Sequence, residues 1–335
     1  GSENVKMIKA QLSPETAELA NGCEAVCIFV NDHCNEDVLS IFQSCGVKLI
    51  LLRSAGFNHV DVNLAAEYGM NCRRVPVYSP YAVAEMAIAL LMGLVRKIPK
   101  AYNRVREHNF AIGGLEGFDI RGKTIGILGT GNIGRIAAKI LNGFSPGRLL
   151  GYDVYPHDDM KNMGMEYCSI EELISQSDII SVHVPLLPET YHIIGKENIA
   201  KMKDGVVIVN VSRGGLVDAE ALEDGLKSGK IGGVGMDVYE NEQSYFFKDC
   251  SDQILTDDVL ARLLTYNNVI ITAHQAFLTK EALQTIGETT AQNLKDFISG
   301  TSSGNELKPI VKRASSHGNL TKEAMAAASA AAKGE

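Results

Sequence analysis

Three short polar segments contain the side chains best suited to chemistry in this sequence. Residues 210–215 contain Arg213, residues 236–242 contain three carboxylates, and residues 273–277 contain His274. A guanidinium offers paired donors to a planar anion, and an imidazole near a carboxylate can exchange a proton at neutral pH. If these groups converge, they can bind a carboxylate-bearing substrate and protonate it.

Each of the three segments begins where a strand is expected to end. The expected strands span residues 206–209, 233–237 and 269–272. Open α/β sheets bind their ligands at the carboxyl ends of the strands. Taken singly, such an arginine is usually a surface charge, such a glutamate is solvated, and such a histidine is structural. Their shared position at strand ends favours one common site instead.

A glycine-rich turn predicts a nucleotide site. The hexapeptide Gly129-Thr130-Gly131-Asn132-Ile133-Gly134 follows the apolar run 124–128 and precedes a helical pattern. Glycines in this setting let backbone N–H groups approach a pyrophosphate at a helix N-terminus. The pattern therefore predicts a bound dinucleotide, with Gly129, Gly131 and Gly134 in its site.

Asp153 indicates which dinucleotide is bound. It ends the next expected strand, residues 149–153, and no arginine follows it immediately. A carboxylate there accepts from a ribose 2′-hydroxyl and repels a 2′-phosphate, so NAD is expected rather than NADP. Residues 117–124 also satisfy the phosphate-loop pattern of ATPases, but they precede a strand instead of following one, and we reject that interpretation.

Alternating strand and helix patterns predict an α/β protein. Strands are expected at residues 5–10, 25–30 and 48–52, and helices from Ser13, at 36–44 and at 80–95. We expect two doubly wound parallel-sheet domains with a cleft between them. These are a flavodoxin-like substrate domain, residues 1–79 and 275–307, and a Rossmann NAD-binding domain, residues 80–274. Residues 308–335 are expected to be a disordered or frayed tail.

Composition excludes several classes of protein. A net charge of −8 without a basic stripe argues against nucleic acid, and the apolar run 82–95 is too short to span a membrane. Seven scattered cysteines favour a reducing compartment, and we expect a cytoplasmic protein. No metal site is expected, because Cys27, the central candidate among Cys23, Cys27, His33 and Cys34, lies in a strand pattern.

With the glycine loop, the polar segments resemble the D-isomer-specific 2-hydroxyacid dehydrogenase family, especially its bacterial fermentative D-lactate dehydrogenases. The resemblance extends from about residue 12 to residue 307 and includes the runs 21–32, 236–242 and 274–279. Phosphoglycerate and formate dehydrogenases usually have proline after the catalytic glutamate, whereas residues 243–249 here open an aromatic and acidic loop. Formate dehydrogenases also pair their histidine with glutamine. The resemblance therefore implies reduction of pyruvate to D-lactate by NADH.

The resemblance also implies residue roles. Arg213 would clamp the substrate carboxylate, and His274 would protonate the keto oxygen as hydride arrives. Glu242 would orient His274 and favour its protonated form. The substrate pocket would be completed by the backbone N–H groups of Ala55 and Gly56 and by Tyr78.

Cofactor contacts are implied along several strand ends, together with a homodimer. The contacts are Asn132 and Ile133 at the pyrophosphate, Asp153 on the ribose, Val184, Pro185 and Thr190 along the adenosine, and Val211, Ser212 and Asp237 near the nicotinamide. His183, beside the cofactor wall, is assigned to the strand core.

Two departures from the family pattern stand out. Met86 follows Glu85 where many relatives have histidine, which removes any polar contact made there. Family members have a strand-helix unit before the segment equivalent to residues 5–10, and we expect this first unit to be missing from this sequence. If the chain begins here, we expect exposed strand edges and a less stable first domain.

Three alternatives to a D-lactate dehydrogenase remain open. The first is a reductase of larger aliphatic or aromatic 2-keto acids, which pocket volume would decide. The second is an NAD-sensing binding protein akin to corepressors of this fold, although an intact Arg213, Glu242 and His274 set disfavours it. The third is a catalytically inactive fragment.

Overall fold

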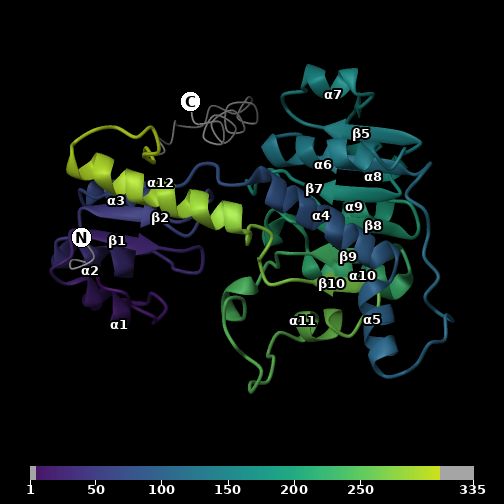
Figure 1. Cartoon of the computed structure of the whole chain (residues 1–335), viewed down its shortest axis with the longest axis horizontal. Helices are drawn as coiled ribbons and strands as arrows, with labels where there is room; N and C mark the ends of the chain where they lie inside the picture. Colours follow the sequence, from purple (N-terminus) through teal and green to yellow (C-terminus); the bar gives the residue numbers. More distant parts are fainter. Residues whose placement is uncertain (1–4, 310–335) are drawn as a thin grey trace. The chain divides into compact units, whose positions relative to one another are not determined.

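The computed structural model describes residues 5–309, and the tail from residue 310 lies outside this range. The chain divides into two compact units, one made of residues 5–78 and 279–309 and the other of Ser79–Leu278. Each unit is built around its own parallel sheet (Figure 1). The prediction of an α/β protein with two parallel sheets is confirmed.

A seven-stranded parallel sheet forms the centre of the unit Ser79–Leu278. Its strand order is β10-β9-β8-β7-β4-β5-β6, so the direction of strand addition reverses between β4 and β7, where open α/β sheets bind their ligands. The strands are β4 (Thr124–Leu128), β5 (Arg148–Tyr152), β6 (Glu166–Tyr167), β7 (Ile179–Val182), β8 (Val206–Asn210), β9 (Ile231–Met236) and β10 (Val269–Ile271).

Alternating side chains of this sheet fill two separate cores. In β8, Val206 and Ile208 belong to one core, and Val207 and Val209 belong to the other. Successive side chains of a strand point to opposite faces, so a strand buried on both faces is apolar throughout, as β8 is. This accounts for the continuous apolar runs that precede the polar segments.

Helices cover both faces of the sheet (Figure 1). On one face, α4 and α6 pack against each other, and α4 also contacts β8, β9 and β10. The hydroxyl of Ser79 caps the first turn of α4, and Pro80 opens the helix, which explains the sharp start read from the sequence. The helices are α4 (Pro80–Val95), α5 (Ile98–Arg106), α6 (Asn132–Asn142), α7 (Asp158–Asn162), α8 (Ile170–Gln176), α9 (Lys196–Lys201), α10 (Ala219–Ser228) and α11 (Asp258–Leu263).

The other unit contains a three-stranded parallel sheet in the order β1-β2-β3. The central strand, β2, is buried at all four positions. The helix α12 packs on β2, and the guanidinium of Arg73 donates to the carbonyl of Asn293 in that helix, which joins the two chain segments of this unit. Its elements are α1 (Pro14–Ala17), the 3₁₀ helix η2 (Glu18–Ala20), β1 (Ala25–Ile28), α2 (Glu36–Cys45), β2 (Leu49–Leu52), α3 (Val62–Glu67), β3 (Asn71–Arg73) and α12 (Lys280–Ile298).

Some local expectations were wrong or incomplete. The strand expected at residues 5–10 does not form, and all six residues are exposed. A β-prone run needs a neighbouring strand to supply its hydrogen bonds, and this segment has none among residues 5–309. The sequence pattern also missed α3, β3 and β6, which are too short to show a clear period.

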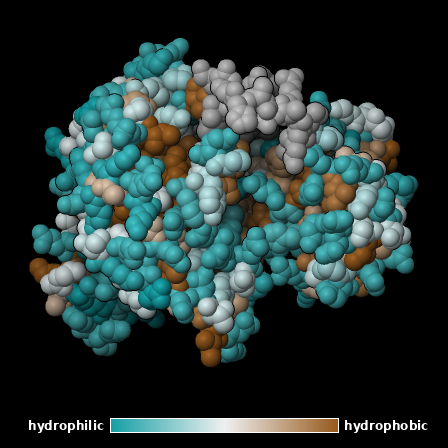
Figure 2. Space-filling model, turned by 180° about the vertical axis from the view of Figure 1, so that it is seen from behind, coloured by the Kyte–Doolittle hydropathy of each residue, from teal (hydrophilic) through white to brown (hydrophobic). Residues whose placement is uncertain are grey.

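The visible face of the molecule is mostly hydrophilic, with apolar residues in small groups (Figure 2). Among residues 5–309, no helix is both long enough and apolar enough to cross a membrane. The same residues contain no cluster of histidine, cysteine and carboxylate side chains that could hold a metal ion.

Candidate active site

The expected site segments of the larger unit all follow the carboxyl ends of its strands. The glycine turn follows β4, Asp153 follows β5, Val184 follows β7, and Arg213 follows β8. Asp237 and His274 follow β9 and β10. Because these strands are parallel and adjacent, the six segments share one edge of one sheet.

The glycine turn after β4 forms a cradle that side chains would fill. Gly129 has φ +93°, and a Cβ atom added there would lie 2.7 Å from the backbone nitrogen of Val184. A Cβ atom at Gly134 would lie 1.9 Å from the carbonyl oxygen of Gly129. At Gly131, which precedes α6, an added Cβ would meet open space. Open space beside the N–H groups of a helix N-terminus fits a dinucleotide pyrophosphate.

The Asp153 carboxylate is held in a defined position. Its Oδ2 accepts hydrogen bonds from the backbone N–H and the hydroxyl of Thr130, at 2.6 and 3.1 Å. Its Oδ1 accepts from the backbone N–H of Tyr155 at 3.0 Å. The buried Thr130 hydroxyl also lies 2.8 Å from the hydroxyl of Tyr167 on β6. The glycine turn itself therefore orients the carboxylate expected to bind the ribose.

The segment after β7 is braced internally. The Thr190 hydroxyl donates to the carbonyl of Pro185 at 2.6 Å and accepts from the N–H of Leu187 at 2.8 Å. Thr190 is buried, whereas Pro185 is exposed. The buried Thr190 hydroxyl therefore holds the conformation of the segment, and the exposed Pro185 is the residue accessible to a ligand.

The turn after β8 positions Arg213. Buried Asn210 accepts from the N–H of Ser212 and donates to the carbonyl of Arg213. The hydroxyl of Ser212 donates to the carbonyl of Val184 at 2.8 Å, which ties this turn to the segment after β7. Sequence reasoning gave Asn210 no role, although a buried amide directly before a polar turn is a recognisable signal.

His274 and Glu242 form a close pair. The Nδ1 atom of His274 lies 2.7 Å from Oε1 of Glu242, and the other carboxylate oxygen accepts from the N–H of Tyr239 at 3.0 Å. The two side chains are only 16% and 22% exposed, so water screens the pair weakly. With Nδ1 occupied by Glu242, Nε2 remains as the proton-donating atom of the ring.

Asp237 holds the segment that carries His274. Its buried carboxylate accepts from the hydroxyl of Thr272 at 2.5 Å and from the N–H groups of Gln275 and Ala276 at 2.9 and 2.7 Å. Its carbonyl accepts from the N–H of His274 at 2.7 Å. This geometry makes Asp237 a positioning residue for His274, a role not foreseen from the sequence, where only a cofactor contact was expected.

Two of the expected substrate-binding residues in the smaller unit lie in a braced turn after β2. The Ser54 hydroxyl donates to the carbonyl of Gly56 at 2.7 Å, and Arg74 donates to the carbonyl of Ala55 at 2.8 Å. Burial lowers the pKa of the Arg74 guanidinium. Tyr78, the third residue expected here, is half-buried at the end of the first chain segment of this unit. Sequence reasoning missed Arg74, which holds the turn in shape.

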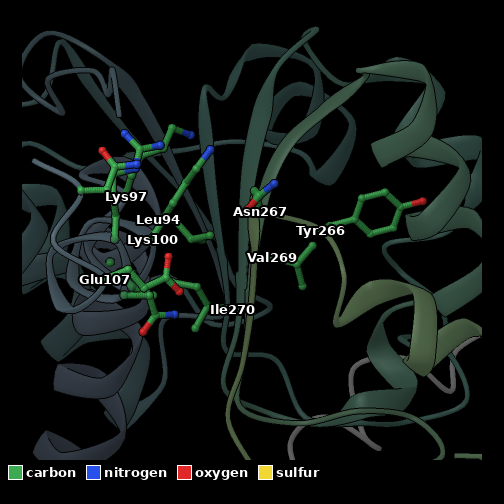
Figure 3. Close-up of a pocket in the computed structure, with 13 residues that line it drawn as sticks. Leu94, Lys97, Lys100, Glu107, Tyr266, Asn267, Val269 and Ile270 are labelled. Atoms are coloured by element: carbon green, nitrogen blue, oxygen red, sulfur yellow. The ribbon is translucent and has the colours of Figure 1, made fainter. Parts of the chain in front are cut away.

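A separate cavity of about 370 Å³ lies at the amino end of β10 (Figure 3). Lys97, Lys100 and Glu107 from α5 and its flanks line it, together with Tyr266 and Asn267 ahead of β10. None of the expected site residues lines this cavity, and those residues follow the opposite ends of the strands. The cavity therefore does not belong to the candidate active site.

Comparison with known proteins gives a consistent result. Residues 88–276 match the family model "D-isomer specific 2-hydroxyacid dehydrogenase, NAD binding domain". The chain is 51% identical to a D-lactate dehydrogenase of Escherichia coli over 88% of this chain and 90% of that protein. It is 44% identical to an aromatic 2-oxoacid reductase of Clostridium sporogenes over 88% of each.

A solved structure shows the same fold. It is the D-lactate dehydrogenase of Aquifex aeolicus in complex with NAD and lactic acid, with a TM-score of 0.79 and 35% identity. The match covers 87% of this chain and 88% of that one. The expected family resemblance and the expected NAD cofactor are confirmed.

Proposed function

Because the chain belongs to the D-isomer specific 2-hydroxyacid dehydrogenase family, we propose that it reduces pyruvate to D-lactate with NADH. The observation that carries the proposal is the Glu242–His274 pair at 2.7 Å, at the strand edge that also holds the glycine cradle and Arg213. The name of the Escherichia coli relative supports the choice of lactate.

The residues of the larger unit divide the reaction between them. Gly129, Gly131 and Gly134 would admit the pyrophosphate, and Asp153 would accept from the ribose hydroxyl groups. The bound NADH supplies the hydride. Arg213 would hold the substrate carboxylate through paired N–H donors, because within residues 5–309 its guanidinium donates a single hydrogen bond, to the carbonyl of Ser212.

Proton transfer is assigned to His274. Glu242 accepts a hydrogen bond from Nδ1, so it orients the ring. Nε2 then donates its proton to the keto oxygen as negative charge develops there, and the neutral ring takes the proton back in lactate oxidation. The substrate contacts of Ala55, Gly56 and Tyr78 and the cofactor contacts of Asn132, Ile133, Val184, Pro185, Thr190, Val211, Ser212 and Asp237 remain part of the proposal.

The test is NADH oxidation with pyruvate by the wild type and by His274→Asn, followed by assignment of the product's configuration. Asparagine tolerates the left-handed backbone of this position, where φ is +54°. His108→Asn is the matched control, since His108 is an exposed histidine with φ +58°. We expect D-lactate from the wild type and the control, and NADH binding without turnover from His274→Asn.

Two other outcomes lead to other functions. Turnover of phenylpyruvate in preference to pyruvate would indicate a reductase of larger 2-keto acids, as the name of the Clostridium sporogenes relative suggests. NADH binding without turnover of any 2-keto acid by the wild type would indicate an NAD-sensing protein or an inactive fragment.

The proposal includes a homodimer. Ile98, Tyr102 and Val105 follow one another at helical spacing on α5 and are 53%, 59% and 50% exposed. An apolar stripe on a helix surface fits a second copy of the chain. We expect Ile98→Asp with Val105→Lys to convert a dimer into a monomer, as measured by light scattering. A wild-type monomer would contradict this part of the proposal.

A reducing compartment, the cytoplasm, is also proposed. All seven cysteines are free thiols, and burial raises the pKa of Cys34 and Cys72 to about 12, which keeps these two unreactive. Pyruvate reduction there would regenerate NAD⁺, as fermentation requires. Thiol titration of the freshly isolated protein, together with cell fractionation, tests this assignment.

A further inference from the structure

The loop between the 3₁₀ helix η4 (Glu242–Ser244) and α11 contains two adjacent phenylalanines with different surroundings. Phe246 is 7% exposed and belongs to the core of the larger unit. Phe247 is 40% exposed, and its ring centroid lies 5.7 Å from that of His274, with the planes tilted by 41°. An aromatic ring with a large exposed fraction thus lies directly beside the assigned proton donor.

Both rings of this pair are attached to strained backbone. Phe247 has φ +64° and His274 has φ +54°, in the left-handed region that bulky side chains rarely adopt. Such conformations persist only where the surrounding structure imposes them, and they concentrate at functional sites. The position of Phe247 is therefore not an accident of a loosely packed loop.

Hydrogen bonds hold the loop that contains Phe247. The carbonyl of Glu242 accepts hydrogen bonds from the N–H groups of Tyr245 and Phe246, at 3.0 and 2.8 Å. The Tyr245 hydroxyl accepts from the N–H groups of Thr256 and Asp257, at 3.1 and 2.9 Å, which closes the loop. Phe247 therefore follows directly after a buried residue in a loop that these hydrogen bonds hold closed.

The geometry of the substrate determines what such a ring would do. The keto carbon of a 2-keto acid bears a carboxylate on one side and the variable side chain on the other. If the carboxylate is bound by Arg213 and the oxygen by Nε2 of His274, the side chain must occupy the remaining space near the imidazole. A methyl group needs little of that space, whereas a benzyl group needs much more.

We propose that Phe247 is a specificity-determining residue whose ring, placed beside His274, limits the accepted 2-keto acid side chain to a small one. The inference rests on the proposed function and deepens it by naming a residue that selects the substrate. It also accounts for the exposed ring, whose outer face would be covered by the substrate methyl group in the productive complex.

The test compares kcat/KM for phenylpyruvate and pyruvate in the wild type and in Phe247→Gly. Glycine removes the ring and adopts a positive φ without strain. The substitution should therefore not lower the unfolding temperature through a backbone effect. The ratio of kcat/KM for phenylpyruvate to that for pyruvate is expected to rise by at least about tenfold, since a change of pocket size discriminates side chains by about 10- to 200-fold.

Two further variants separate specificity from loop structure. Ile254→Gly is the matched control, because Ile254 lies in the same loop and is 90% exposed. It should leave the ratio unchanged even if it loosens the loop. Phe247→Tyr keeps the ring and should keep the wild-type ratio.

The outcomes distinguish this inference from the proposed function. An active wild type whose ratio stays within twofold in Phe247→Gly would overturn the inference alone. An equal change of the ratio in Ile254→Gly would also overturn it, because loop mobility would then explain the effect. A wild type inactive on every 2-keto acid would overturn both this inference and the proposed function.

Discussion

The carboxylate of Glu242 lies 2.7 Å from Nδ1 of His274, although the two residues are 32 positions apart in the sequence. They meet because β9 and β10 are adjacent parallel strands, and one polar segment follows the carboxyl end of each. A carboxylate at this distance accepts a hydrogen bond from Nδ1, fixes the orientation of the ring and leaves Nε2 as the remaining donor.

Glu242→Gln tests this pairing. The amide keeps the shape of the carboxylate but loses its charge, so it replaces a charge-assisted hydrogen bond to Nδ1 of His274 with a weaker one. We expect kcat for pyruvate reduction to fall by about 100-fold. Steady-state turnover measures this loss. Glu240→Gln is the control, and an equal loss of kcat there would refute a special role for Glu242.

Asp237→Asn tests the support of the histidine segment. An asparagine amide group cannot accept the hydrogen bonds that one carboxylate oxygen now receives, so at least one buried N–H loses its partner. We expect a loss of roughly 2–3 kcal/mol in the free energy of unfolding and a lower kcat. Urea denaturation measures the first and turnover the second. The exposed Asp252 supplies the control, and a variant as stable as Asp252→Asn would contradict the assigned positioning role.

Asp153→Ala tests the choice of cofactor. Removing the carboxylate removes a charge-assisted hydrogen bond to the ribose and the repulsion of a 2′-phosphate. We expect kcat/KM for NADH to fall by about 10- to 100-fold and the preference for NADH over NADPH to shrink. Asp158→Ala, at an exposed carboxylate in α7, should change neither value. If Asp153→Ala keeps the wild-type preference for NADH over NADPH, Asp153 does not bind the ribose.

His183 predicts a pH dependence of stability. Burial lowers the pKa of His183 from 6.5 to about 4, its Nδ1 is buried without a hydrogen bond within residues 5–309, and its Nε2 lies 2.8 Å from the Ser181 hydroxyl. The unfolded chain therefore takes up this proton more readily than the folded protein. The contribution of neutral His183 to the free energy of unfolding is fully present above the pKa of the unfolded chain. It is lost as pH falls from about 6.5 towards about 4.

The expected loss is on the order of 2 kcal/mol in the free energy of unfolding between about pH 6.5 and about pH 4.5. Denaturant titrations of the cofactor-free protein at several pH values measure it. His183→Gln, which cannot titrate, should have a flatter curve in this window. Parallel curves for the wild type and this variant would rule out His183 as the source.

Much of the larger unit could be read from local sequence patterns. The runs that became β4, β5, β7, β8, β9 and β10 are apolar because both faces of this sheet are covered, and the start of α4 follows from Ser79 and Pro80. By contrast, the segment at residues 5–10 was wrongly predicted to be a strand, because no local pattern shows whether a strand will find a partner.

The sequence by itself determined the glycine cradle. Gly129 at φ +93° and Gly134 against the carbonyl of Gly129 are demanded by the local path of one short turn. Local backbone geometry depends on neighbouring residues, so a hexapeptide and its flanking patterns are enough to specify it.

Only the tertiary structure showed that the two glutamates of one short segment serve different histidines. Residues 236–242 offer Glu240 and Glu242; the residue types alone do not choose between them, and the family resemblance assigned Glu242 to His274 but gave Glu240 no partner. In the fold, Glu240 lies 2.8 Å from Nε2 of His192, and Glu242 pairs with His274. These pairings depend on the register of β9 against β10 and on the tight turn after β9. Together they direct Glu240 and Glu242 toward different histidines. Such long-range pairing is a property of packed strands, and no local pattern contains it.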